Sequence, residues 1–121
     1  MDKQSPFDAL ATDVARFTEG DCHYLARAIH ERTGWPMMTF SDRFGPCLHA
    51  FVLMPDLRAL DVEGPCNIRT FKRRWKSTKI AEINWPKLRS AFGPPEFGRY
   101  TYARAGIIAD RLLDLAEVPC V

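Results

Sequence analysis

The sequence predicts an α+β fold in which a cysteine-bearing helix packs on a small, mostly antiparallel sheet, with further helices at both ends of the chain. Apolar residues recur at helical spacing around Cys22, short apolar runs occupy the middle of the chain, and a long helical pattern closes it. The 121 residues are enough for one hydrophobic core. We therefore expect a single domain over residues 1–121.

A first helix is predicted to begin at Ser5. Serine at the N-cap followed by Pro6 at the first helical position is a typical helix start. The apolar residues that follow at helical spacing predict core packing; they are Phe7, Leu10, Val14 and Phe17.

The second helix, predicted from about Cys22 to Thr33, carries a cysteine in its first turn. Asp21 is a suitable N-cap residue, because its short carboxylate can accept from the unpaired N–H groups of that turn. Gly34 is expected just after the helix ends. These N–H groups and the helix dipole favour negative charge, so the pKa of a thiol at this position should be lowered.

Three strand-like runs follow this helix. Residues 37–40 form a short candidate strand, and residues 47–54 have the nearly continuous apolar character of a strand buried on both faces. Residues 57–62 fit a returning strand after turn chemistry at Pro55 and Asp56, and Glu63 is expected to end it. These strands should form the sheet beneath the cysteine helix.

Patterns are weaker after Gly64. A basic segment from Arg69 to Lys79 contains Phe71 and Trp75 four residues apart, which fits a short amphipathic helix with two core anchors. The alternative is a nucleic-acid surface with stacking aromatics, but the net charge of only +2 does not favour it.

The rest of the chain is predicted to end in helices. Residues 80–85 fit either a strand or a loop, residues 86–92 a short helix, and residues 99–117 a long helix. No run is apolar enough to predict a membrane span.

Cys22, His49 and Asp61 are the candidate catalytic residues. A histidine in an apolar strand can take the thiol proton near neutral pH, and an aspartate on the next strand can hold the imidazole. The alternatives are a buried structural cysteine, a core histidine bonded to a carbonyl, and a solvated strand-end carboxylate. An odd-length turn near Pro55 would place His49 and Asp61 on one face and a two-residue turn would not; the sequence leaves both open.

These motifs resemble the papain-like cysteine hydrolases, and most closely the transglutaminase-like and small bacterial or phage members. The resemblance covers roughly residues 18–64 and lies in a Gly-x-Cys helix start at Gly20, a His-Ala-aromatic strand at His49 and an aspartate at Asp61. It implies a nucleophile at Cys22, a base at His49 and an orienting acid at Asp61. Gln4 is the only glutamine, so an oxyanion-hole glutamine is not identified and the Cys22 amide is the candidate donor.

The predicted function is thiol-dependent hydrolysis or acyl transfer at an amide, peptide or isopeptide bond, with a peptide or protein substrate. His23 and Trp35 are candidate substrate-binding residues, although His23 on its own fits a solvent-facing position and Trp35 fits simple packing. The alternative is a catalytically inactive protein of the same fold that acts by binding, as in an inhibitory protein of a phage or mobile element.

No metal or organic cofactor is expected. A zinc site built from Cys22, His23, Cys47 and His49 would need adjacent or alternate ligands, whereas paired zinc ligands are usually separated by about two to five residues. The N-terminal residues show no secretory pattern, so we expect a cytoplasmic protein with reduced thiols. Besides Cys22, the cysteines predicted to be structural are Cys47, Cys66 and Cys120.

Overall fold

The structure is a computed structural model that describes residues 17, 21–41, 47–75, 79–94 and 99–116. Within these ranges the elements are, in chain order, α2 (Cys22–Thr33), β1 (Met37–Ser41), β2 (Cys47–Leu53), β3 (Arg58–Asp61), β4 (Gly64–Asn67), α3 (Ile68–Arg74), β5 (Lys79–Glu82), α4 (Trp85–Phe92) and α5 (Arg99–Leu115). The helix predicted to begin at Ser5 lies outside the described residues, apart from Phe17, which is fully buried.

Helix α2 has the bounds that the sequence predicts. Its predicted apolar face is buried, and its flanks are largely buried as well because α5 and the sheet both pack against it. Gly34 follows the last turn with a φ of 75°, and its N–H donates to the His30 carbonyl oxygen at 2.8 Å. This left-handed conformation suits glycine because a side chain would clash with the backbone there.

Replacing Gly34 with alanine is expected to lower the free energy of unfolding by about 1 kcal/mol. Apart from its own residue and its chain neighbours, a Cβ at this position would meet no atom within 4 Å, so the loss comes from the backbone conformation alone. Gly34→Asn should lose less, because asparagine tolerates the left-handed region. Urea unfolding of the three proteins measures the difference; equal stability of the alanine variant and the parent would contradict it.

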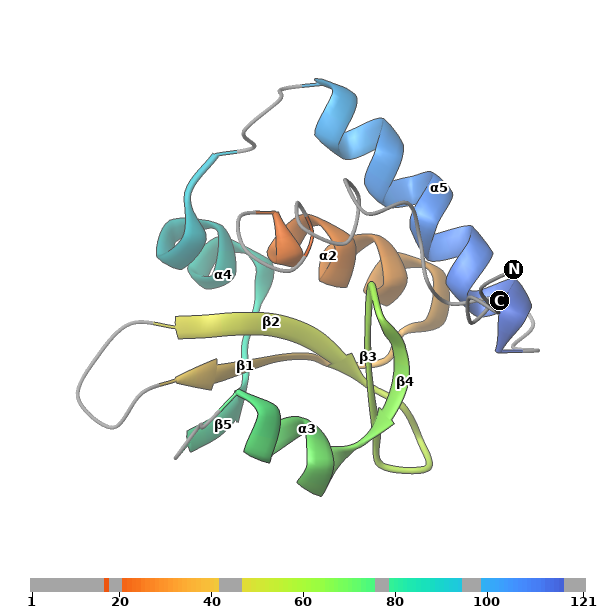
Figure 1. The fold of residues 1–121 in the computed structure, drawn as a ribbon. Helices are drawn as coiled ribbons and strands as arrows, with labels where there is room; N and C mark the ends of the chain where they lie inside the picture. The colour runs from red at the N-terminus through yellow and green to blue at the C-terminus, as the bar shows by residue number, and fades with distance from the viewer. Residues whose placement is uncertain (1–16, 18–20, 42–46, 76–78, 95–98, 117–121) are drawn as a thin grey trace, which may run out of the picture.

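The strands form one antiparallel sheet in the order β4-β3-β2-β1-β5 (Figure 1). The sequence predicts β1, β2 and β3, and it leaves residues 80–85 open, where the structure has β5 and the beginning of α4. Strand β4 was not predicted, because Gly64 and Pro65 usually end strands. Here Gly64 takes a φ of 98° after a tight turn, and Pro65 is tolerated because β4 is an edge strand.

The sheet is covered on both faces. In Figure 1, α2 lies on one face with α4 and α5 beside it, and α3 lies on the other. Ala50 and Val52 of β2 belong to the core under α2, while Phe51 packs with Phe40 and Phe71 on the α3 side. The predicted α+β class and the strand buried on both faces are confirmed. In the part of the chain that is described, no helix combines the length and apolar character needed to cross a membrane.

Candidate active site

Cys22 is the first residue of α2, as predicted, and its side chain is buried. The prediction that the Asp21 carboxylate caps this helix is wrong. Asp21 stands at the N-cap but makes no capping hydrogen bond, and its carboxylate accepts from the Thr101 hydroxyl of α5 at 3.2 Å. The carboxylate thus ties the start of α2 to α5.

The β2–β3 hairpin brings His49 and Asp61 onto the same face of the sheet. Val52 of β2 pairs with Leu60 of β3. Nearer the turn, the Met54 N–H donates to the Arg58 carbonyl oxygen, so residues 55–57 form the turn. This is the odd-length arrangement that the sequence leaves open. Nε2 of His49 lies 2.8 Å from Oδ2 of Asp61, and both side chains are buried.

Cys22 fills the space beside β2 where pairing with β3 stops. The amide of Leu53 donates toward β1 and that of Met54 toward β3. Because amides alternate in direction along a strand, the Ala50 amide also faces the β3 side. It donates to Cys22 Sγ at 3.4 Å. The sulfur is therefore held against the backbone next to His49.

Electrostatics in this cluster favour a charged pair. Burial raises the pKa of the Cys22 thiol, but the neighbouring imidazoles of His23 and His49, the charge of His49 and the hydrogen bond from the Ala50 amide lower it to about 7. Burial alone would lower the pKa of His49, whereas Asp61 and Cys22 raise it to about 9. Between these values the thiolate and the imidazolium coexist.

Trp75 covers the imidazole of His49. It follows α3 directly, and its ring stacks on His49 with centroids 4.1 Å apart and planes 9° apart. Phe71 meets the same imidazole edge-on at 5.7 Å and is fully buried. The prediction of two aromatic anchors in the basic segment is confirmed, although α3 ends at Arg74. Phe71 is therefore not free to stack on a nucleic-acid base, and His49 covers one face of the Trp75 ring.

The two candidate substrate-binding residues have different positions. His23 is fully buried, so the solvent-facing interpretation is wrong. Its Nε2 lies 2.8 Å from the carbonyl oxygen of Gly93 at the end of α4. Trp35 follows the far end of the 12-residue α2 and is half-buried. At about 1.5 Å per residue, the helix separates Trp35 from Cys22 by roughly 18 Å. The structure therefore does not bring Trp35 close to Cys22.

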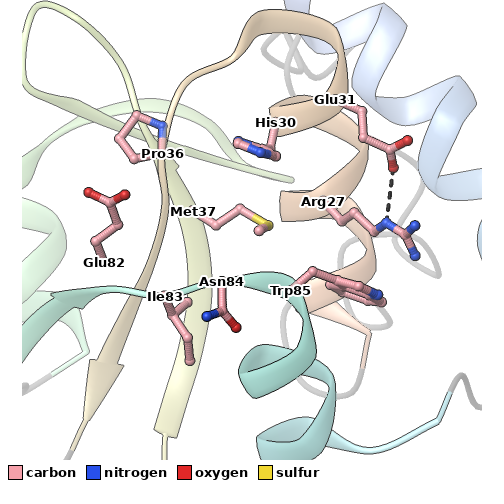
Figure 2. Close-up of a pocket in the computed structure, with 9 residues that line it drawn as sticks. All are labelled: Arg27, His30, Glu31, Pro36, Met37, Glu82, Ile83, Asn84 and Trp85. Atoms are coloured by element: carbon pink, nitrogen blue, oxygen red, sulfur yellow. Dashed lines mark ion pairs between the residues drawn. The ribbon is translucent and has the colours of Figure 1, made fainter.

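A cavity of about 580 Å³ lies between α2 and the segment that joins β5 to α4 (Figure 2). Arg27 and His30 line it from α2, and Glu82 and Trp85 face them. The Arg27 guanidinium lies 4.5 Å from the centroid of the Trp85 ring. No residue of the candidate triad lines this cavity.

The triad is closed to solvent. The exposed fractions of Cys22, His49 and Asp61 are 2%, 0% and 4%. A substrate carbonyl can therefore reach the sulfur only after a neighbouring group moves.

The zinc alternative gains no support from the described residues. Among them, no group of three or more His, Cys, Asp or Glu side chains is placed to hold a metal ion. The side chains of Cys47 and Cys120, two of the cysteines predicted to be structural, lie outside the described part.

No protein-family model, curated protein or solved structure matches this chain. The resemblance to papain-like hydrolases therefore remains a prediction that depends on the motif residues. The geometry around Cys22 is therefore the basis for a functional proposal.

Proposed function

We propose that this protein is a thiol-dependent hydrolase or acyltransferase acting on an amide, peptide or isopeptide bond. Cys22 is the nucleophile, His49 the base and acid, and Asp61 the residue that orients the imidazole. The observation that carries the proposal is the buried 2.8 Å contact between His49 and Asp61, which lies beside the Cys22 thiol. The sulfur of Cys22 accepts a hydrogen bond from the amide of Ala50, the residue that follows His49.

The arrangement of protons fits this chemistry. Nε2 of His49 is committed to Asp61, and the buried Nδ1 has no hydrogen-bond partner among the described residues, which leaves it to hold the thiol proton. The Cys22 thiolate attacks the carbonyl carbon, and the oxyanion that forms accepts from the Cys22 amide. His49 gives its proton to the leaving nitrogen as the C–N bond breaks, which leaves a thioester on Cys22.

The second half of the reaction restores the ion pair. His49, now neutral, takes a proton from a water molecule or an incoming amine as that group attacks the thioester carbonyl. The C–S bond breaks, and Cys22 leaves as a thiolate beside the imidazolium. Water completes a hydrolysis, and an amine completes an acyl transfer.

Burial of the triad favours a second candidate function. A protein of this fold that acts only by binding would need no path to Cys22, and Cys22 is 2% exposed. In that case the His49–Asp61 pair would serve the core rather than a reaction. The two candidates differ in whether Cys22 ionises at low pH and in whether a reagent can reach it.

The test measures ionisation and access separately. Ultraviolet absorbance of the thiolate, with Cys22→Ser as the baseline, gives the pKa of Cys22 without requiring access. Alkylation by iodoacetamide with mass-spectrometric readout for each cysteine gives access. We expect the Cys22 thiolate to form near pH 7, because its surroundings lower its pKa to about 7, and to react faster than the other thiols at that pH.

His49→Ala is the matched variant for this test. Removing the imidazolium should return the pKa of Cys22 to about 8.5 or above, so that its thiolate fraction at neutral pH falls about tenfold. An unchanged profile would exclude the triad. A low-pH thiolate that iodoacetamide does not reach would instead favour the binding protein. Fast alkylation would justify a substrate screen for amidase, peptidase and acyl-transfer activity.

A further inference from the structure

Helix α3 carries a group of cations on the side that faces away from the sheet. Arg69, Lys72 and Arg73 are spaced three and four residues apart, which places them on one face of the helix, and all are exposed. Phe71 lies on the opposite face, where it is buried among aromatic residues of the sheet. We call Arg69, Lys72 and Arg73 the basic face of α3.

The basic face has no counter-charge among the described residues. Arg74, on another side of the helix, pairs with Glu63 at 2.6 Å, but no described carboxylate forms an ion pair with the basic face. Like charges at this spacing destabilise a helix. Arg69 adds to the effect, because it lies in the first turn, where the helix dipole disfavours a cation. Bound carboxylates would offset this repulsion.

The opposite side of α3 contacts the candidate active site. Trp75, directly after the helix, stacks on His49, and Phe71 meets the same imidazole edge-on. A helix with its side chains is about 10–12 Å across, so the basic face lies roughly one helix diameter from His49. An extended peptide rises about 3.3 Å per residue, so about four residues cover that distance. A peptide whose scissile bond lies at Cys22 can therefore reach the basic face.

We propose that the basic face of α3 binds an acidic stretch of an extended peptide substrate, about four residues from the bond that Cys22 attacks. The inference rests on the proposed function, because it names the substrate class of that reaction. Side chains on one side of an extended peptide recur at every second residue, about 6.6 Å apart. Arg69 and Arg73 are separated by about 6 Å along the helix axis. Carboxylates at alternate positions of the peptide therefore match the spacing of the basic face.

A nucleic acid fits this surface less well than an acidic peptide. Proteins that bind single strands without sequence preference combine cations with aromatic side chains on which bases stack. Phe71 is 1% exposed and lies opposite the basic face, and the Trp75 ring has one face against His49. An acidic peptide needs only the cations. The remaining explanation is that the basic face binds nothing and only keeps α3 hydrated.

Fluorescence anisotropy of a fluorescein-labelled peptide with glutamates at alternate positions measures the binding. Every protein carries Cys22→Ser, so the peptide is not cleaved and binding does not depend on the thiol. Lys72→Gln combined with Arg73→Gln is the basic-face variant, and glutamine preserves the helix propensity. Lys87→Gln combined with Arg111→Gln is the matched control, because it also replaces one lysine and one arginine, at exposed positions of α4 and α5.

We expect the Kd of the basic-face variant to rise about tenfold, since each exposed ion pair contributes about threefold, and the Kd of the control to stay close to that of the parent. A peptide with glutamines in place of the glutamates should bind the parent about as weakly, and about 0.5 M salt should also weaken the binding. Equal losses in the two double variants would overturn the inference. Absence of binding, or tighter binding of an oligothymidylate of the same length, would overturn it as well.

A second measurement places the bound peptide relative to Cys22. A chloroacetyl group is attached about four residues from the glutamates, and a thiolate displaces its chloride as the new C–S bond forms. With Cys22 intact, the acidic peptide should alkylate it about tenfold faster than the glutamine peptide does, and the basic-face variant should lose this advantage. Equal rates would overturn the substrate role. A failure of the proposed function shows separately, as a Cys22 thiolate titration that His49→Ala leaves unchanged.

Discussion

Asp61→Ala is expected to lower the free energy of unfolding at neutral pH by about 3 kcal/mol or more, as is usual when one partner of a buried ion pair is removed. The substitution leaves the His49 imidazole without its partner at Nε2, in a position that is 0% exposed. It also removes the acceptor for the Glu63 N–H, which donates to Oδ1 of Asp61 at 2.9 Å. Urea unfolding at fixed pH measures the loss.

Asp56, in the turn between β2 and β3, offers a matched control. Asp56 also accepts from the amide two residues ahead, with Oδ1 3.2 Å from the Arg58 nitrogen, but Asp56 is exposed and has no histidine partner. Asp56→Ala should therefore change stability little. Asp61→Asn should fall between Asp61→Ala and the parent, because its amide nitrogen replaces one of the two oxygens that accept from His49 and from the Glu63 N–H. Equal losses in Asp61→Ala and Asp56→Ala would show that the His49 contact contributes nothing.

The elements around Cys22 could be predicted because local chemistry specifies them. Gly34 ends α2 in the left-handed conformation, and the apolar run that contains Phe51 is long enough only for a strand covered on both sides. Strand β4 could not be predicted in the same way. Its partner is β3 and its first residues are Gly64 and Pro65, so its position depends on a tight turn rather than on strand propensity.

The same distinction applies to the candidate site. Cys22, His49 and Asp61 carry recognisable residue types on recognisable elements, so the sequence indicated them. The register that joins His49 to Asp61 depends on a turn with Leu57 at a φ of 67°, which is uncommon for leucine and was not predictable. Trp75 was recognisable as an anchor but not as the cover of His49, because that contact joins α3 to β2 across the sheet.

His23 is buried at a junction of several elements. Residues at the start of α2 are buried on several faces because α4, α5 and the sheet all meet there. His23, Tyr24, Trp85 and Phe92 form the aromatic cluster at this junction. A histidine beside a tyrosine, with two further aromatics on a later short helix, is compatible with such a cluster but does not specify it.

Cys22→Ser is expected to give stability a pH dependence that the parent lacks. In the parent, between pH 7 and 9, the folded pair carries one proton on His49, whose pKa is about 9, while the Cys22 thiol with a pKa of about 7 has lost its own. The unfolded chain also carries one proton in most of this range, on Cys22. Equal proton numbers in the two states mean that the pair adds no slope to the stability curve.

In the serine variant this balance is lost. The folded protein still holds a proton on His49 beside Asp61, but the unfolded chain holds none above a pKa of about 6.5, so stability falls as pH rises, by at most about 1.4 kcal/mol per pH unit. The raised pKa of His49 thus gives its full stabilisation at pH values below the pKa of the unfolded chain. This contribution is lost as pH rises through the pKa of His49 in the folded protein. That folded value lies below 9 in the variant, because Cys22 no longer raises it.

Urea unfolding at a series of pH values between 7 and 9 measures the slopes. Cys66→Ser is the control, since it removes a half-buried thiol from β4 and leaves the pair intact. The difference between Cys22→Ser and the parent cancels the groups that both proteins share. Parallel curves would mean that, with Asp61 holding the proton on His49, Cys22 keeps its proton in the fold, and a nucleophile activated by an imidazolium would then be excluded. Diverging curves would establish that Cys22 is ionised in the fold, by a measurement that needs neither a substrate nor a path to the sulfur.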